Sequence, residues 1–125
     1  MNPVDQKILI VDGHPVYINK TQGFLEGLTF RNITLAKTGQ EGIEKSESEK
    51  PGLVIMSGIL PDMDAHEVCR MIKEKHSSSR IIVQIGLFTE EYDIEKFKEF
   101  GADVVLDRKE KDLAPLQEAV VRLIS

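Results

Sequence analysis

The chain has 125 residues, 41% of them hydrophobic, and its 16 basic and 21 acidic residues give a formal net charge of −5. This size and composition suit one globular domain, and the acidic balance argues against nucleic-acid binding by the domain alone, because that affinity depends on neutralising phosphates. A single cysteine, Cys69, excludes an internal disulfide and a cysteine metal cluster.

The first half of the chain predicts three strands separated by two helices. Short, continuous apolar runs bounded by turn residues are typical of strands buried on both faces of a sheet. Gly23 and Gly27 weaken the first helix. The expected strands are residues 7–11, 31–36 and 53–56, and the expected helices are residues 16–28 and 39–48.

The second half continues the same alternation. Asp64, followed three residues later by Glu67, predicts the N-cap of a helix. Thr89 predicts the cap of the next helix, and Gly101 its end. The expected strands are residues 81–85 and 103–106, and the expected helices are residues 64–76, 89–100 and a last one from Asp112 or Leu113.

Five strands alternating with five helices predict an α/β fold, in which residues 1–125 form one doubly wound domain around a parallel sheet. Functional groups in such sheets lie at the carboxyl ends of the strands, where the strand order reverses. The residues at or just beyond those ends are Asp12, Ser57, Gly86 and Arg108. We expect a candidate site at this edge.

Four stretches of the sequence resemble the receiver domain of bacterial response regulators. They are ILIVDGHP (residues 8–15), AKTGQEGIE (36–44), PGLVIMSGILPDMDAHEVCRMIK (51–73) and FGADVVLDRKE (100–110). Their spacing matches over nearly the whole chain. The resemblance implies a flavodoxin-like five-stranded sheet with the strand order 2-1-3-4-5, and a place in two-component phosphorelay signalling.

The family's chemistry depends on groups at the strand ends. Two adjacent acids after the first strand hold Mg²⁺, and an aspartate after the third accepts a phosphoryl group from a histidine kinase. A threonine or serine after the fourth strand binds the phosphoryl oxygens, and a lysine after the fifth supplies positive charge. An anion approaching a carboxylate needs such cations to offset repulsion.

This sequence keeps few of those groups. Asp12 and Gly13 stand at the acid positions, Ser57 at the phosphoacceptor position and Arg108 at the lysine position. The hydroxyl position holds Gly86 or Ile85, depending on the direction of counting, and the aromatic that helps the switch on the fifth strand is replaced by Val105. Asp12 and one positive charge are all that remain.

We therefore interpret the chain as a degenerate receiver domain that is not an enzyme, accepts no phosphate and needs no metal or cofactor. A serine hydroxyl is a weak nucleophile without a base, and no G-x-S-x-G motif surrounds Ser57. We expect Arg108 to contact Asp12, because a planar guanidinium suits a carboxylate. The domain would act through a protein partner or an attached output domain.

The remaining candidates have simpler interpretations. We expect Asp62 and Asp64 to be turn and cap residues, and Cys69 to be inert core. His66 and His76 are expected to be isolated and solvated.

On the predicted fourth helix, Tyr92 lies in line with Lys96 and Glu99, away from the apolar face. An exposed tyrosine among charges suits a partner anchor, so this is the candidate partner surface.

Two alternatives stay open. One is a conventional phosphorelay role through unorthodox chemistry, and the other is a flavodoxin-like domain whose emptied pocket binds a small ligand. The first residues do not form a signal-peptide pattern, and no apolar run is long enough to span a membrane, so a cytoplasmic location is expected.

Overall fold

The apolar runs of the sequence form the strands of a sheet in the computed structural model, which describes residues 3–86, 91–108 and 113–124. Within these residues the strand and helix ends differ from the expected ones by no more than one or two positions. After a short 3₁₀ helix (Pro3–Asp5), the elements are β1 (Ile8–Val11), α1 (Pro15–Gly27), β2 (Ile33–Ala36), α2 (Gly39–Glu49), β3 (Leu53–Ser57), α3 (Ala65–Lys75), β4 (Arg80–Ile85), α4 (Glu91–Glu99), β5 (Val104–Asp107) and α5 (Ala114–Ile124).

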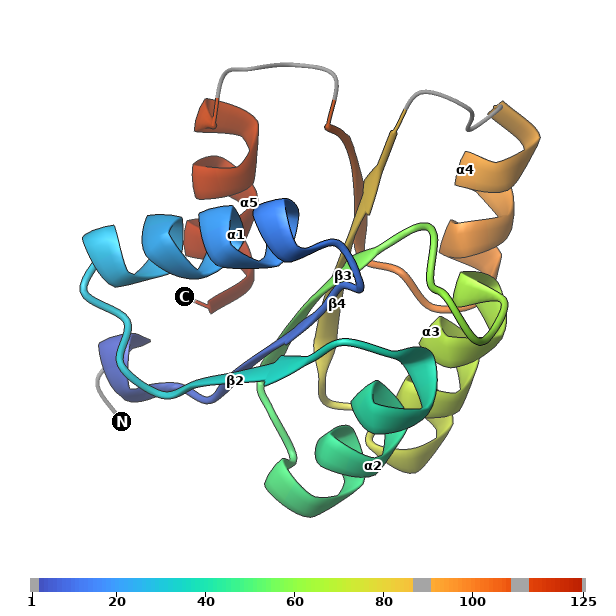
Figure 1. The fold of residues 1–125 in the computed structure, drawn as a ribbon, viewed down its shortest axis with the longest axis horizontal. Coiled ribbons are helices and arrows are strands. Elements are labelled where there is room, and N and C mark those ends of the chain that lie inside the picture. The colour runs from blue at the N-terminus through green and yellow to red at the C-terminus, as the bar shows by residue number, and fades with distance from the viewer. Residues whose placement is uncertain (1–2, 87–90, 109–112, 125) are drawn as a thin grey trace.

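The strands form one parallel sheet in the order β2-β1-β3-β4-β5, which confirms the expected doubly wound, flavodoxin-like topology. Helices α1 and α5 cover one face of the sheet, and α2, α3 and α4 cover the other (Figure 1). The chain order reverses between β1 and β3, so the carboxyl ends of these strands border the position where such folds place their sites.

Two apolar layers hold the helices to the sheet, because successive side chains of a strand point to opposite faces. Ile8 and Ile10 of β1 pack towards α1 and α5, whereas Leu9 and Val11 pack towards α2 and α3. The central strands β3 and β4 follow the same rule over residues 53–56 and 81–83, which are apolar at every position because both of their faces are covered. This explains why the runs in the sequence are continuous and do not alternate.

Side chains at the helix starts accept the free N–H groups there. His14 caps α1, Thr38 caps α2 and Asp64 caps α3, as expected for Asp64. Glu67 does not complete a capping box, because its carboxylate binds Arg70 at 2.6 Å.

At the end of α4, Gly101 has a φ of 114°, which suits glycine. Thr89, the expected cap of α4, lies outside the described residues. None of the described helices is long and apolar enough to cross a bilayer.

Candidate functional site

Polar side chains replace apolar ones where β1, β3, β4 and β5 reach the carboxyl edge of the sheet. The strand alternation that places Ile10, Ile55 and Leu106 towards α1 and α5 continues beyond them. It therefore brings a row of polar residues to the same side of that edge, made of Asp12, Ser57, Gln84 and Arg108.

Asp12 is the one acid of this row, and only 2% of its surface is exposed. Its Oδ2 accepts a hydrogen bond from Nη2 of Arg108 at 2.9 Å, and its Oδ1 accepts one from the backbone N–H of His14 at 2.9 Å. The contact expected between Asp12 and Arg108 is thus present and direct. Both carboxylate oxygens are engaged within the chain.

Arg108 is held on three sides. Its Nη2 also lies 3.3 Å from Oε1 of Gln84, and its Cζ lies 4.3 Å from the ring centroid of Tyr17. A guanidinium over an aromatic face is attracted by the ring's negative face. The Tyr17 ring in turn lies 4.8 Å from the ring of His14. The start of α1 therefore packs against the guanidinium of Arg108 through the Tyr17 ring.

Gly13, at the position of the family's second acid, has no room for a side chain. A Cβ there would lie 2.9 Å from Cδ of Pro61 and 3.0 Å from the carbonyl oxygen of Lys37. The proline ring and the backbone of the neighbouring loop would have to move before any acid could be accommodated at residue 13.

Ser57 ends β3 and is almost fully buried, with 6% of its surface exposed. Its Oγ accepts the backbone N–H of Ile59 at 3.1 Å, a local turn within the β3–α3 loop. Among the described residues, the hydroxyl has no carboxylate or imidazole partner that could act as its base.

The end of β4 lacks a hydroxyl by either count. Ser57 pairs with Gln84 in the sheet, and the next residue, Ile85, packs into the core on the side of α3 and α4. Gly86 follows the strand, and a Cβ there would meet nothing within 4 Å. Val105, at the position of the switch aromatic, packs against the same core.

Sequence analysis missed Gln84 and Tyr17 as members of the site. Gln84 interrupts the apolar run of residues 81–85, a signal that could have been read as a polar side chain aimed at a partner. Tyr17 carries no such signal, because its role depends on where α1 lies relative to β5.

The two acids of the β3–α3 loop have structural roles: Asp64 caps α3, as expected, whereas Asp62 binds the start of α2 in addition to lying in the expected turn. Asp62 accepts the N–H groups of Gln40 at 3.0 Å and Gly39 at 2.7 Å, and these bonds hold its pKa below the usual value. For Asp64, burial opposes but does not outweigh the hydrogen bonds from His66, so its pKa is also lowered. No group of three or more metal-ligating side chains occurs among the described residues.

The expectation of a solvated His66 is wrong. Its ring lies 4.0 Å from that of Phe97, its Nδ1 lies 2.8 Å from Asp64, and only 12% of its side chain is exposed. The imidazole of His66 therefore packs against an aromatic ring between α3 and α4 and is largely shielded from solvent. Cys69 lies in the core, as expected, and burial raises the pKa of its thiol to about 12.

The candidate partner surface is described only in part. Lys96 is half-buried with its Nζ 5.6 Å from the ring centroid of Phe100, and Glu99 is exposed. The side chain of Tyr92 lies outside the described residues. This surface therefore stays a prediction.

Comparison with known proteins gives a consistent family match. The model of the family described as "Response regulator receiver domain" matches residues 8–121. The alkaline phosphatase synthesis transcriptional regulatory protein PhoP of Bacillus subtilis is 33% identical over 100 residues, which cover 80% of this chain and 41% of that protein. The chemotaxis protein CheY of Listeria monocytogenes is 25% identical over 114 residues, 84% of this chain and 96% of that protein.

The solved structures agree on the fold. A receiver domain protein (CheY-like) from Methanospirillum hungatei superposes with a TM-score of 0.86 at 24% identity, covering 95% of this chain and 94% of that one. The chain spans less than two thirds of several curated relatives, including 50% of the nitrate/nitrite response regulator protein NarL of Escherichia coli.

Proposed function

Since the chain belongs to the family of response regulator receiver domains, we propose that it acts in two-component signalling through a protein contact that needs no phosphorylation. The observation that carries this proposal is the ion pair between Asp12 and Arg108. It places a cation of the protein itself on the carboxylate that would otherwise face Mg²⁺.

The residues at this edge do not fit the divalent metal of the family. Mg²⁺ needs near-octahedral oxygen ligands and is usually held by one or two carboxylates. Here both oxygens of Asp12 already accept hydrogen bonds, and Gly13 has no space for a second acid. A metal would have to displace Arg108 and leave its guanidinium among Tyr17 and Gln84.

The phosphoacceptor position supports the same proposal. Ser57 offers a hydroxyl in place of a carboxylate, and that hydroxyl is used in a local turn. Phosphoryl transfer depends on positioning and on neutralising charge rather than on covalent help from the protein. Because Arg108 is paired with Asp12 and Gly13 has no room for a second acid, the described residues offer neither a pair of carboxylates for a metal nor a hydroxyl at the end of β4 for that task.

Without metal binding or phosphoryl transfer at this edge, the domain would act by contact with a protein partner. The names of two relatives describe regulators of transcription or of the response to nitrate, and this chain matches 41% and 50% of their lengths. We propose that an output domain, attached or separate, reads one constitutive surface of this domain. Movement of a switch aromatic has no counterpart, because Val105 stands at that position.

The alternative of small-ligand binding at the emptied pocket gains no support. The described cavity beside Arg108, between α1, β4, β5 and α5, has a volume of about 50 Å³. Pockets for cofactors or drug-sized ligands usually have about 300–1,000 Å³. A nucleotide or flavin would not fit there without separating the two helices.

Intact-mass measurement after incubation with acetyl phosphate and Mg²⁺ tests the proposed function. We expect no added phosphate on the natural protein or on Ser57→Ala, with a conventional receiver domain as the positive control. A stoichiometric gain of one phosphate that is lost in Ser57→Ala would overturn the proposal.

A further inference from the structure

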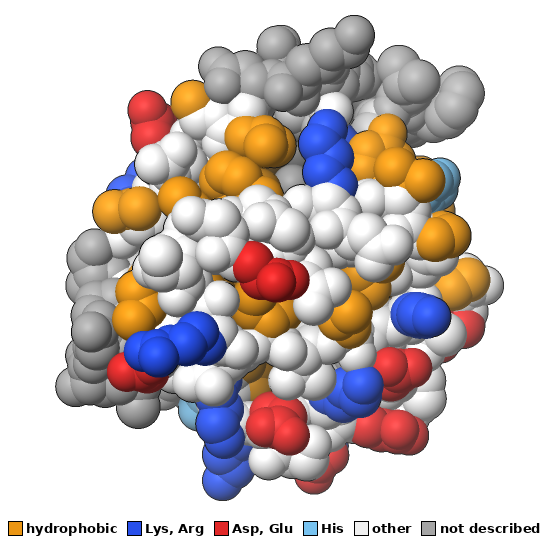
Figure 2. All heavy atoms as spheres, turned by 60° about the vertical axis from the view of Figure 1, so that its left-hand side comes forward, with side chains coloured by type: hydrophobic (Ala, Val, Ile, Leu, Met, Phe, Trp, Pro, Cys, Tyr) orange, Lys and Arg blue, Asp and Glu red, His pale blue; other side chains and the backbone are white. Residues whose placement is uncertain are grey.

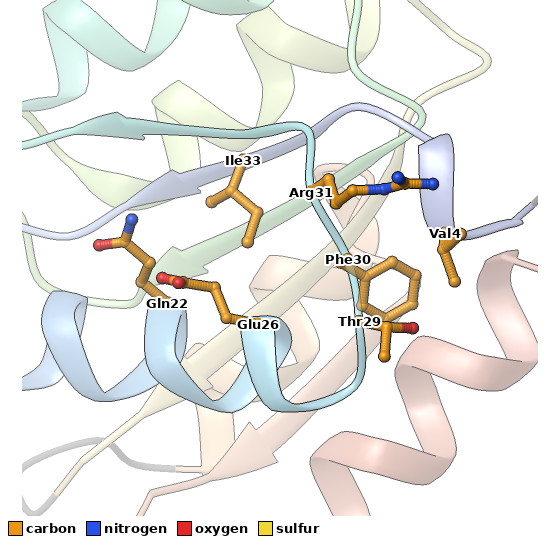
Figure 3. A pocket seen from close by; sticks show the side chains of 7 residues that line it. All are labelled: Val4, Gln22, Glu26, Thr29, Phe30, Arg31 and Ile33. Carbon is orange, nitrogen blue, oxygen red and sulfur yellow. The ribbon is translucent and has the colours of Figure 1, made fainter.

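A cavity lies at the opposite end of α1 from Asp12. It is an open groove of about 620 Å³ between the second half of α1, the start of β2 and the 3₁₀ helix. Its lining residues are Val4, Gln22, Glu26, Thr29, Phe30, Arg31 and Ile33 (Figure 3). The α1–β2 loop faces the side of the molecule that Figure 2 brings forward, where hydrophobic side chains gather above and opposite charges mix below.

The turn that ends α1 places Phe30 at the apolar floor of the groove. The N–H of Thr29 donates to the carbonyl of Glu26 at 2.9 Å, and the N–H of Phe30 donates to that of Leu25 at 3.1 Å. This pair of bonds is a Schellman motif, and Thr29 adopts its left-handed position with a φ of 73°. The turn directs Phe30 inwards, where it is 8% exposed and packs in the core beside Ile33.

Two polar side chains rise from α1 along one wall. Gln22 and Glu26 are one turn apart on the side of α1 that faces β2, and the carboxylate of Glu26 lies towards Gln22 (Figure 3). The structure describes no cation paired with Glu26 and no hydrogen bond from the side chain of Gln22. The carbonyl end of α1 adds partial negative charge at the same place.

The cation closest in sequence is held elsewhere. Arg31 extends away from Glu26 towards the 3₁₀ helix (Figure 3), where its Nη2 lies 3.0 Å from Oδ1 of Asp5. The groove thus offers an uncompensated carboxylate, an amide oxygen and an apolar floor. These are the partners that a guanidinium on a methylene stem requires.

We propose that this groove binds an arginine side chain of a protein partner. The guanidinium donates to the carboxylate of Glu26 and the amide oxygen of Gln22, and the stem lies over Ile33 and Phe30. The inference rests on the proposed function, because both assign protein contact to the domain. Its test involves guanidinium binding and no phosphate, so either can fail without the other.

The experiment titrates the ¹⁵N-labelled full chain with N-acetyl-arginine N-methylamide and follows the backbone amide signals. We expect saturable shifts confined to residues around Gln22, Glu26 and Phe30. The matching citrulline compound has the same shape without the charge and should cause none. Glu26→Gln should weaken binding about three- to tenfold, the range of a partly exposed charged hydrogen bond. Glu118→Gln, an exposed carboxylate on α5, should leave binding unchanged.

Several results would overturn the proposal. One is the absence of shifts at this groove with the arginine compound, and another is equal binding of the citrulline compound. Equal weakening by Glu26→Gln and Glu118→Gln would show general charge attraction. Binding of agmatine without binding of the capped arginine would assign the groove to a free small molecule instead of a protein side chain.

Discussion

Arg108 and Asp12 are separated by 96 positions in the sequence, yet Nη2 of one lies 2.9 Å from Oδ2 of the other. The pair spans the carboxyl edge from β5 to β1, across β3 and β4. Asp12 is 2% exposed on its side chain and Arg108 14%. Because Asp12 is fully buried and most of Arg108 is covered, the carboxylate depends on the guanidinium for its charge compensation.

Removing the cation alone should therefore destabilise the domain. For Arg108→Met we expect a loss of about 2–4 kcal/mol in the free energy of unfolding, since a buried carboxylate is left without its partner. Urea denaturation followed by circular dichroism measures this. The double variant Asp12→Asn with Arg108→Met should recover part of the loss, because no buried charge remains. A single variant as stable as the natural protein would contradict the assigned pairing.

Gly23 of α1 allows the prediction of a substitution that stabilises the domain. A Cβ at Gly23 would meet nothing within 4 Å, and the residue is exposed inside the helix. Gly23→Ala should raise the free energy of unfolding by about 0.5–1 kcal/mol, because alanine is the better helix former.

Gly101→Ala is the matched control for that substitution. Its φ is 114° and a Cβ would lie 2.5 Å from Cγ of Lys73, so alanine is strained there. We expect it to destabilise by more than about 1 kcal/mol. If thermal unfolding gave both alanines the same sign, the described backbone of one of these sites would be wrong.

Asp62 should make stability depend on pH in the acid range. Hydrogen bonds from the N–H groups of Gln40 and Gly39 lower its pKa in the folded state. A carboxyl whose pKa is lowered by folding stabilises the folded state fully at any pH above its unfolded-state pKa, which is about 4. That contribution is lost as the pH falls through the pKa of the folded state. The stability difference between the natural protein and Asp62→Ala should thus shrink on acidification. A difference that stays constant between neutral pH and the acid range would refute this.

The sequence sufficed for the sheet because both faces of the central strands are buried. Continuous apolar runs such as residues 8–11 can only be satisfied between two helical layers. The helix ends were predictable where one side chain acts locally, as Asp64 does at the start of α3. The resemblance to receiver domains added the strand order, which local patterns do not contain.

The site could be predicted only in outline. The contact of Arg108 with Asp12 followed from their strand-end positions and opposite charges. The roles of Tyr17 and Gln84 depend on packing between α1, β4 and β5. The burial of His66 against Phe97 depends likewise on packing between α3 and α4. Pro61 leaves no room for a side chain at Gly13 because two loops approach each other there. The spacing of residues in the sequence does not predict that approach.

The central claim is that Arg108 occupies the place of the family's metal, and a Mg²⁺ titration of the ¹⁵N-labelled protein tests it most directly. We predict that the amide signals of Asp12, Gly13, Ser57 and Gly58 stay unchanged up to millimolar Mg²⁺, because the described ligands are engaged or missing. Ca²⁺ under the same conditions controls for weak attraction to the acidic surface. Saturable shifts at these residues with Mg²⁺, reduced in Asp12→Asn, would contradict the account.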